Sequence, residues 1–245
     1  VNPFLVAFQP ANTTANQPLV PNSPIRTATF SDAFTRANSS IIGTTETGGL
    51  QWNDTNCDIF NQQLRMSDSA SAWLTNYAPA NHDITFKVKL NASDATSWVG
   101  LAYRQVNLHD VNGNSYLLYV RQDGQLHLFY GWKDIGTVTV PTGGWATSHT
   151  LRIQVSSIDH KIWWDNVADA DAPVLSVADY GNLGAGDFEF VASCVGPSDV
   201  AYIDDIQVSL APPGTVSGTV VDASTGLPLN GVTVSASSVP PQPRS

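Results

Sequence analysis

The alternation of apolar and polar residues between residues 30 and 210 restricts the fold more than any other feature. Successive side chains of a β-strand point to opposite faces, so a period of two predicts strands that bury one face. No segment combines a helical period with capping residues. The predicted strands cover residues 83–90, 97–104, 115–121, 125–130, 149–156, 161–165, 188–192 and 201–210.

Turn sequences separate these strands. Residues 111–114, 122–124 and 141–144 supply the glycine, asparagine and aspartate that hairpin turns require. Many short strands joined by such turns are typical of an antiparallel sandwich. We therefore predict an all-β fold in which two sheets pack face to face.

The two ends of the chain differ from this central region. Residues 1–29 hold five prolines and one apolar run at 4–8, which predicts an extended arm. The arm is either a linker or a segment that adds a strand to this or a neighbouring subunit. Residues 211–214 (APPG) predict a linker. Residues 215–245 begin with a strand, a turn and a second strand, which cannot bury a core alone.

The charge balance narrows the possible partners. Lysine and arginine total 11 against 21 acidic residues, so the net charge is −10. A nucleic-acid backbone would be repelled at long range, and we predict no nucleic-acid partner. No apolar run reaches the roughly 18 residues of a membrane span. The sequence begins at Val1 with no initiator methionine or signal peptide, which predicts a processed or excised form.

The cysteines and sequons bear on export. Cys57 and Cys194 are either one disulfide of a secreted protein or two unrelated buried thiols. We favour the disulfide because other features also indicate a secreted or cell-surface protein. Sequons of the N-x-S/T type occur at Asn12, Asn38, Asn53 and Asn91, and they matter only if the source glycosylates exported proteins.

Short motifs follow one another in a fixed order through the central region. They are FSDAF at 30–34, Trp52, VGLAYR at 99–104, YLLYVR at 116–121, LRIQV at 151–155 followed by KIWWDN at 161–166, and AYIDDI at 201–206. In this order they resemble the concanavalin A-like, laminin-G-like domains of secreted carbohydrate-active proteins. The resemblance implies a two-sheet jelly roll over about residues 30–210.

A second resemblance lies beyond the linker. Residues 215–234 are similar to the opening of carboxypeptidase regulatory-like modules, with the pattern G-x-V-x-D-x-x-T-G-x-P-L-x-G-V-x-V. Such modules are small β-sandwiches that usually serve as non-catalytic spacers in extracellular proteins. The resemblance therefore implies export, and it implies that residues 215–245 begin a second module.

The residues disfavour one type of catalysis and weakly suggest another. Glucanases of the superfamily carry two carboxylates in an E-x-D-x-x-E strand, and neither Glu46 nor Glu189 stands in that pattern. Asp204 and Asp205 are adjacent in a predicted strand and point to opposite faces. Some alginate-lyase relatives carry a Q-x-H strand. Gln125-Leu126-His127 has that form, but the arginine-rich and tyrosine-containing motifs that accompany it are not evident.

Aromatic and polar residues on successive strands favour sugar binding, because sugar rings stack on exposed aromatic faces. Some tryptophans must lie in the core, and Trp52, Trp98 and Trp145 are predicted there. In the pair Trp163-Trp164, continuation of the pattern of 151–155 buries Trp164 and exposes Trp163. The predicted ligand-binding residues are Trp163, Tyr103, Arg104, Tyr119, Arg121, Tyr130 and Trp132.

The resemblance also implies a structural calcium between the first and last strands. Asp32 near the start and Asp204 or Asp205 near the end match those positions, and calcium prefers such oxygen ligands. Residues 108–114 are instead predicted to form a hairpin turn.

Our leading hypothesis is a secreted, non-catalytic, lectin-like module of a larger extracellular protein, with a polysaccharide or glycan as its partner. The alternatives are a structural or assembly subunit that self-associates through residues 1–29, and a polysaccharide lyase or glycoside hydrolase.

Overall fold

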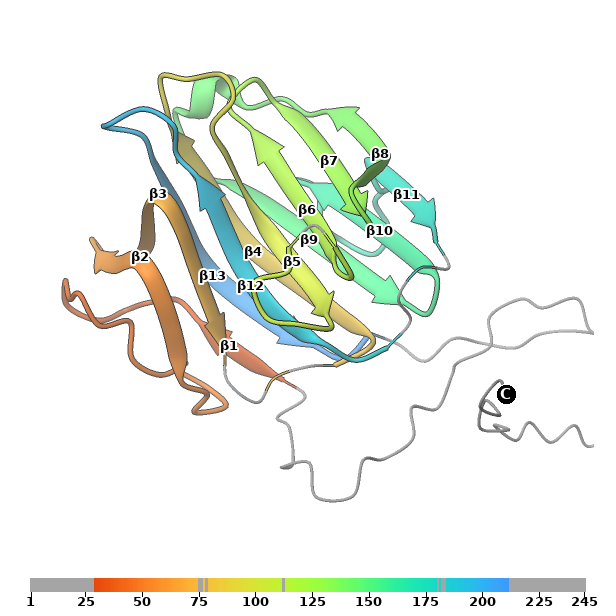
Figure 1. Cartoon of the computed structure of the whole chain (residues 1–245), viewed down its shortest axis with the longest axis horizontal. Coiled ribbons are helices and arrows are strands. Elements are labelled where there is room, and N and C mark those ends of the chain that lie inside the picture. The colour runs from red at the N-terminus through yellow and green to blue at the C-terminus, as the bar shows by residue number, and fades with distance from the viewer. Residues whose placement is uncertain are drawn as a thin grey trace, which may run out of the picture.

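The computed structural model describes residues 29–74, 77, 79–111, 113–179, 181 and 184–211. Within these residues the chain is almost entirely β-structure (Figure 1). The elements are β1 (Phe30–Asp32), β2 (Trp52–Phe60), β3 (Gln63–Leu74), β4 (His82–Asn91), β5 (Trp98–Gln105), β6 (Tyr116–Arg121), β7 (Gln125–Tyr130), β8 (Lys133–Thr139), the 3-10 helix η1 (Gly143–Trp145), β9 (His149–Ser156), β10 (Asp159–Trp164), β11 (Leu175–Ala178), β12 (Asp187–Ser193) and β13 (Val200–Ser209). The predicted all-β fold is confirmed.

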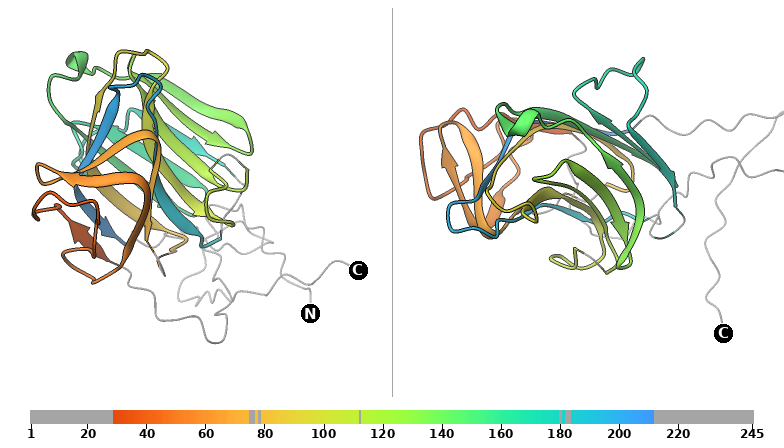
Figure 2. Two further views of the ribbon diagram at one scale, coloured as in Figure 1. Left: turned by 60° about the vertical axis from the view of Figure 1, so that its left-hand side comes forward. Right: turned by 90° about the horizontal axis from the view of Figure 1, so that it is seen from above.

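The strands form two curved layers that lie one over the other (Figure 2). The front sheet, which faces the viewer in Figure 1, has the order β2-β3-β12-β5-β6-β7-β8, and every pairing in it is antiparallel. The back sheet has the order β11-β10-β9-β4-β13-β1, also antiparallel. Such an arrangement is the predicted jelly-roll sandwich.

Strand β3 belongs to both layers. Its first half, Leu64 to Ser67, pairs with β13 of the back sheet, and its second half, Ser69 to Trp73, pairs with β12 of the front sheet. The exposed Asp68 between the halves has a φ of 56°, which bends the strand at that point. Thus one strand joins the two sheets by continuous hydrogen bonding.

The core lies between the layers, where alternate residues of each strand meet. Strand β4 contributes Ile84, Phe86, Val88 and Leu90, and β12 contributes Phe188 and Phe190, all buried. The rings of Phe86 and Phe190 meet edge to face with centroids 5.0 Å apart. Burying one such side chain stabilises the fold by about 1.5–3 kcal/mol. Trp52 and Trp145 lie in this core, as predicted.

The ends of the chain lie outside the described residues. These are the arm, apart from residue 29, and residues 212–245, which hold the carboxypeptidase regulatory-like sequence. The assembly role and the second module therefore stay predictions. Over the part of the chain that the structure describes, no helix has the length and apolar character needed to cross a membrane.

Candidate functional site

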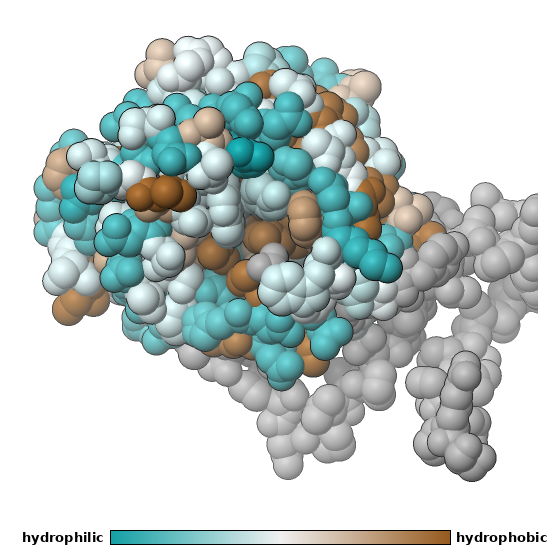
Figure 3. All heavy atoms as spheres, turned by 45° about the horizontal axis from the view of Figure 1, so that its top comes forward, coloured by the Kyte–Doolittle hydropathy of each residue, from teal (hydrophilic) through white to brown (hydrophobic). Residues whose placement is uncertain are grey.

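The outward side of the front sheet gathers most of the partly exposed aromatic residues of the sandwich. We call this surface the front face and define it by three rows of side chains that the strand registers place across β3, β12, β5, β6, β7 and β8. The rows are Trp73, Glu189, Ala102, Leu117, Phe129 and Asp134; Ser71, Val191, Gly100, Tyr119, His127 and Thr137; and Ser69, Ser193, Trp98, Arg121, Gln125 and Thr139. The space-filling view shows a hollow near its centre, with hydrophobic and weakly polar side chains at the bottom (Figure 3).

An aromatic cluster occupies the side of this face formed by β5, β6 and β7. The ring of Tyr119 lies parallel to that of His127 at 4.9 Å, with Trp98 at 5.1 Å and Phe129 at 5.6 Å. All four side chains are only partly buried. Ring faces with this exposure offer the apolar surface on which the C–H face of a sugar can stack.

Gly100 is required for the position of Tyr119. A Cβ atom at residue 100 would lie 2.6 Å from Cβ of Tyr119 and 2.2 Å from the carbonyl oxygen of Leu118. Any larger residue would therefore push β6 away from β5. The glycine and the neighbouring Ala102 leave a strip of small side chains beside the aromatic cluster.

His127 is held by groups from β8. Its Nδ1 donates to Oδ2 of Asp134 at 2.8 Å and lies 3.1 Å from Oγ1 of Thr137. Burial raises the pKa of Asp134, but hydrogen bonds from Thr137, His127 and Gly136 outweigh that effect and lower it overall. Nε2 of His127 is buried and has no partner among the described residues. Burial, and then the Asp134 charge, raise the pKa of Tyr119.

A carboxylate lies at the opposite side of the front face. Glu189, on the central strand β12, has only 1% of its surface exposed although it points away from the core. Its Oε2 accepts from Nε2 of Gln105 at 3.1 Å, and its Oε1 accepts from Nδ1 of His109 at 2.8 Å. The ring of His109 meets Trp73 edge to face at 4.5 Å. The strip of small residues lies between this carboxylate and the aromatic cluster.

The structure places only some of the predicted sugar-binding residues on this face. Tyr119 and Arg121 lie in its rows, and Trp132 is 73% exposed in the β7–β8 turn. Tyr103, Arg104 and Tyr130 point into the sandwich instead, so their prediction as ligand contacts is wrong.

Arg104 turns inward because the strand is irregular at that point. Because Trp98 points outward, strict alternation would direct the Arg104 side chain to the front face. Instead, the positive φ of Arg104 (51°) and a register shift against β12 turn the side chain to the inner side of the sheet. Its Nε donates to the carbonyl of Ala80 and its Nη2 to Oδ1 of Asn81. Burial lowers the pKa of its guanidinium. Arg104 is thus part of the interior.

An internal polar cluster surrounds Arg104 between the sheets. The hydroxyl of Tyr103 lies 2.7 Å from Nδ1 of His160, and the ring of Tyr116 lies tilted against that of His160, with centroids 4.4 Å apart. His82 packs edge to face on Tyr103. Burial first, and then the charge of Arg104, lower the pKa of His82 and that of His160 to about 3. Both imidazoles are therefore neutral in the folded protein at neutral pH.

Trp163 points away from the core as predicted but is not exposed. It is only 4% exposed because residues 165–174 fold over it, while Trp164 lies in the core. Its Nε1 donates to the carbonyl of Asp171 at 2.9 Å, and the Arg152 guanidinium lies 4.8 Å from its ring centre. The prediction of a surface ligand contact is wrong, because Trp163 anchors this loop.

The predicted calcium ligands do not form a site. The carboxylate of Asp32 is buried and accepts from both Nη atoms of Arg36, from Nε1 of Trp52 and from the amide of Phe34. Asp204 accepts from Gln63, and Asp205 pairs with Lys87. Among the described residues no group of three metal-binding side chains occurs. These aspartates satisfy protein donors and do not fit a calcium ion.

The predicted disulfide is absent, since Cys57 and Cys194 are both free and buried. Cys57 lies on β2 opposite Met66, whereas the amide of Cys194 bonds to Asp68 from the other side of β3. A strand therefore separates them, and neighbouring strands are spaced about 4.8 Å apart. Burial raises the pKa of both thiols, that of Cys194 to about 11.

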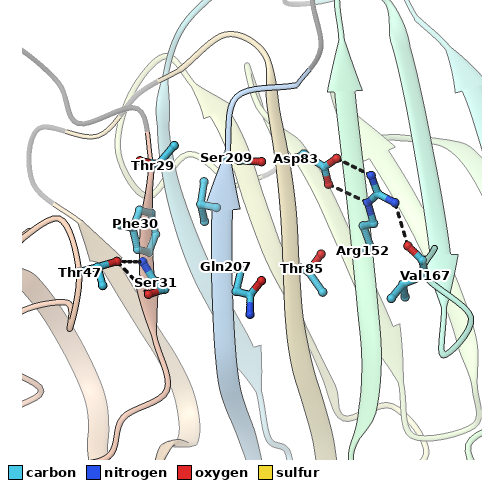
Figure 4. Close-up of a pocket in the computed structure, with 11 residues that line it drawn as sticks. Thr29, Phe30, Ser31, Thr47, Asp83, Thr85, Arg152, Val167, Gln207 and Ser209 are labelled. Atoms are coloured by element: carbon cyan, nitrogen blue, oxygen red, sulfur yellow. Dashed lines mark hydrogen bonds and ion pairs between the residues drawn. The ribbon is translucent and has the colours of Figure 1, made fainter. Parts of the chain in front are cut away.

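A second depression lies on the outer side of the back sheet (Figure 4). It has a volume of about 570 Å³ and is lined mainly by short polar side chains such as Ser31, Thr85 and Gln207. Arg152 at one side is held by Asp83 in a two-pronged ion pair. The depression presents no exposed ring, so the front face is the better candidate site.

Sequence reasoning missed Glu189, Gln105, His109, Trp73 and the outward direction of Trp98. The sequence does indicate the position of one of them, Glu189. Phe188, Phe190 and Ala192 alternate with Glu189 and Val191 in a predicted strand, which places Glu189 on the outer side. This position alone does not indicate a catalytic site, because a single glutamate cannot form a glycosidase acid pair.

Comparison with known proteins supports the fold. No family model matches the chain, and no curated protein matches its sequence. The carbohydrate-binding module CBM66 from Bacillus subtilis superposes with a TM-score of 0.51 and 14% identity, covering 64% of this chain and 94% of that chain. A pseudo β-1,3-glucanase of Mycobacterium tuberculosis superposes with a TM-score of 0.53 and 14% identity, covering 75% of this chain and 98% of that chain. The exoplasmic/lumenal domain of VIP36, solved with Ca²⁺ and Man3GlcNAc, superposes with a TM-score of 0.50 and 10% identity, covering 67% of this chain and 86% of that chain. At these identities the similarity shows the β-sandwich fold alone.

Proposed function

We propose that this chain is a secreted, non-catalytic carbohydrate-binding module that binds a glycan on its front face. The observation that carries the proposal is the partly exposed aromatic cluster around Tyr119, next to a strip of small residues and a hydrogen-bonding carboxylate. Aromatic rings supply stacking surface, and the polar groups at either side can bond the hydroxyls. The names of similarly folded structures, a carbohydrate-binding module and a glycan-bound lumenal domain, agree with it.

Residues around the sheet complete the proposed site. Arg121 lies beside Trp98 in the third row and can donate to sugar oxygens. Trp132, exposed in the turn between β7 and β8, is a further ring that a long glycan could reach. In this proposal the arm and residues 215–245 connect the module to the rest of an extracellular protein.

Variants of the aromatic cluster test the proposal. Binding of the full chain to a panel of polysaccharides is measured by affinity electrophoresis and then by titration calorimetry. We expect Tyr119→Ala and Trp98→Ala each to weaken binding about two- to twelvefold, because stacking contributes on the order of 0.5–1.5 kcal/mol per ring. Tyr202→Ala is the matched control, since Tyr202 lies on β13 of the back sheet. Absence of binding to every glycan, or equal losses in all three variants, would contradict the proposal.

A second candidate function is a polysaccharide lyase, and one specific observation favours it. Gln125 and His127 share the front face with Tyr119 and Arg121, and Asp134 fixes Nδ1 of His127. Nε2 is then the basic nitrogen, and it would have to become accessible to take a proton from a sugar acid, because it is buried in this structure. Incubation with polyuronates, monitored at 235 nm for the unsaturated product, tests this. Activity that His127→Ala abolishes would establish a lyase, and no absorbance change would leave the binding module.

A further inference from the structure

We infer that Glu189, Gln105 and His109 make the front face selective for neutral, hydroxyl-rich glycans over glycans that carry carboxylates. The inference rests on the proposed function, because it assigns a ligand class to the same face. It depends on three side chains that are joined by hydrogen bonds at one side of the front face.

Glu189 is the centre of this group. Its position on the central strand β12 and its burial hold the carboxylate in one place at the surface of the sheet. Gln105 and His109 each donate one hydrogen bond to it. An ionised carboxylate has about four lone-pair positions, so these two hydrogen bonds do not exhaust its acceptor capacity.

Gln105 adds an unfilled acceptor. Because its Nε2 faces the carboxylate, the orientation of the amide is fixed, and Oε1 must point elsewhere. This Oε1 is buried and has no partner among the described residues, although Gln105 itself is 1% exposed. A buried acceptor without a donor is unfavourable, so a hydroxyl group that reached it would be retained.

His109 is the third member of this group. Since a carboxylate cannot donate, Nδ1 of His109 carries the proton of this hydrogen bond. The oxygens of Glu189 and Oε1 of Gln105 are acceptors, so a ligand that reached them would have to supply donors. Sugar hydroxyls are donors, whereas the carboxylate of a uronic acid brings a second negative charge to Glu189.

The surrounding charges do not offset that repulsion. Among the residues of the three rows, Arg121 is the only lysine or arginine, and it lies in the row farthest from Glu189. Asp134 places another carboxylate in the Glu189 row, and the whole chain has a net charge of −10. Like charges that face each other in a binding site disfavour the wrong ligand.

A matched pair of ligands tests the inference. A neutral polysaccharide that binds the full chain is oxidised at its primary hydroxyls to carboxylates, so that the two forms differ in charge but not in backbone. Calorimetry then compares both forms with the wild type and with Glu189→Gln, which keeps the shape of the side chain. Glu46→Gln is the matched control, because Glu46 is exposed and, among the described residues, its carboxylate accepts hydrogen bonds from Ala33 and Thr35.

We expect the oxidised glycan to bind the wild type and Glu46→Gln at least tenfold more weakly than the neutral form. In Glu189→Gln that difference should shrink to about threefold or less. The melting temperature should fall, because the amide keeps only one of the two oxygens that accept from Gln105 and His109, but this loss applies equally to both glycan forms. Equal binding of both forms to the wild type, or an unchanged difference in Glu189→Gln, would overturn the inference and leave the proposed function in place. If no glycan binds at all, the proposed function is refuted, and this inference with it.

Discussion

The internal polar cluster predicts that the protein loses stability in mild acid, well above the pH at which carboxylates titrate. His82 and His160 are both fully buried, and the pKa of each is lowered to about 3 in the fold. In the unfolded chain a histidine has a pKa of about 6.5. The unfolded state therefore binds more protons below that value, and the free energy of unfolding falls as the pH drops from about 6.5 towards 3.

The size of the effect follows from the two pKa values. One unit of pKa difference corresponds to about 1.4 kcal/mol, so each histidine should remove roughly 2.5 kcal/mol between pH 7.5 and 4.5. Together they would remove about 5 kcal/mol, a large part of the 5–15 kcal/mol typical of a domain. Few aspartates contribute in this window, because their ordinary pKa is near 3.9.

Urea unfolding followed by tryptophan fluorescence at pH 7.5, 6.0 and 4.5 measures this loss. His82→Leu removes one titrating group whose two ring nitrogens lack hydrogen-bond partners among the described residues, so its acid-induced loss should be about half that of the wild type. His109→Gln is the comparison variant, since it removes a histidine whose side chain is about half exposed. A wild-type loss below about 1 kcal/mol, or an identical loss in His82→Leu, would refute the reasoning.

Three further predictions concern the loops and the front face. In urea unfolding, Trp163→Ala should lower the free energy of unfolding by about 3–5 kcal/mol, because Trp163 is buried. Trp132→Ala, at the exposed turn, should change it by no more than about 0.5 kcal/mol. Equal effects of the two substitutions would contradict the anchoring role of Trp163. Asp199→Asn should lower the melting temperature at pH 7, because backbone and side-chain hydrogen bonds hold the pKa of Asp199 well below its usual value. The difference in melting temperature from the wild type should shrink as the pH falls below about 4. A difference that stayed constant with pH would argue against this role of the Asp199 charge. Gly100→Ala should lower the free energy of unfolding by about 1–3 kcal/mol, because the added Cβ displaces β6, which carries Tyr119. It should also weaken glycan binding. Wild-type stability together with wild-type binding would contradict the close packing at Gly100.

The sequence was sufficient to predict the fold because nearly every core strand alternates cleanly. Strand β4 carries Ile84, Phe86, Val88 and Leu90 inward, and the prediction placed it within one residue at each end. Strands β2 and β3 were not predicted. Each is interrupted by a residue with positive φ, Asn56 or Asp68, where the strand bends and the alternation changes.

The candidate site could be predicted only in part, because alternation gives the side of a strand and not what covers that side. Trp163 points outward as predicted, but residues 165–174, which follow it in sequence, fold back over it. Arg104 departs from the alternation because of a local bulge. The pair Cys57 and Cys194 shows a different limit, since spacing along the chain does not reveal that β3 lies between them.

Strand β3, which pairs with both layers, has a mechanical consequence. Two sheets that touch only through side chains can slide or splay, but here a continuous ladder of hydrogen bonds runs from β13 through β3 to β12. Relative motion of the layers would break that ladder, so the curvature of the front face is set before any ligand arrives. Adaptation to a new ligand would then be confined to connections such as residues 106–111, which carry His109, while the sheet beneath them stays the same.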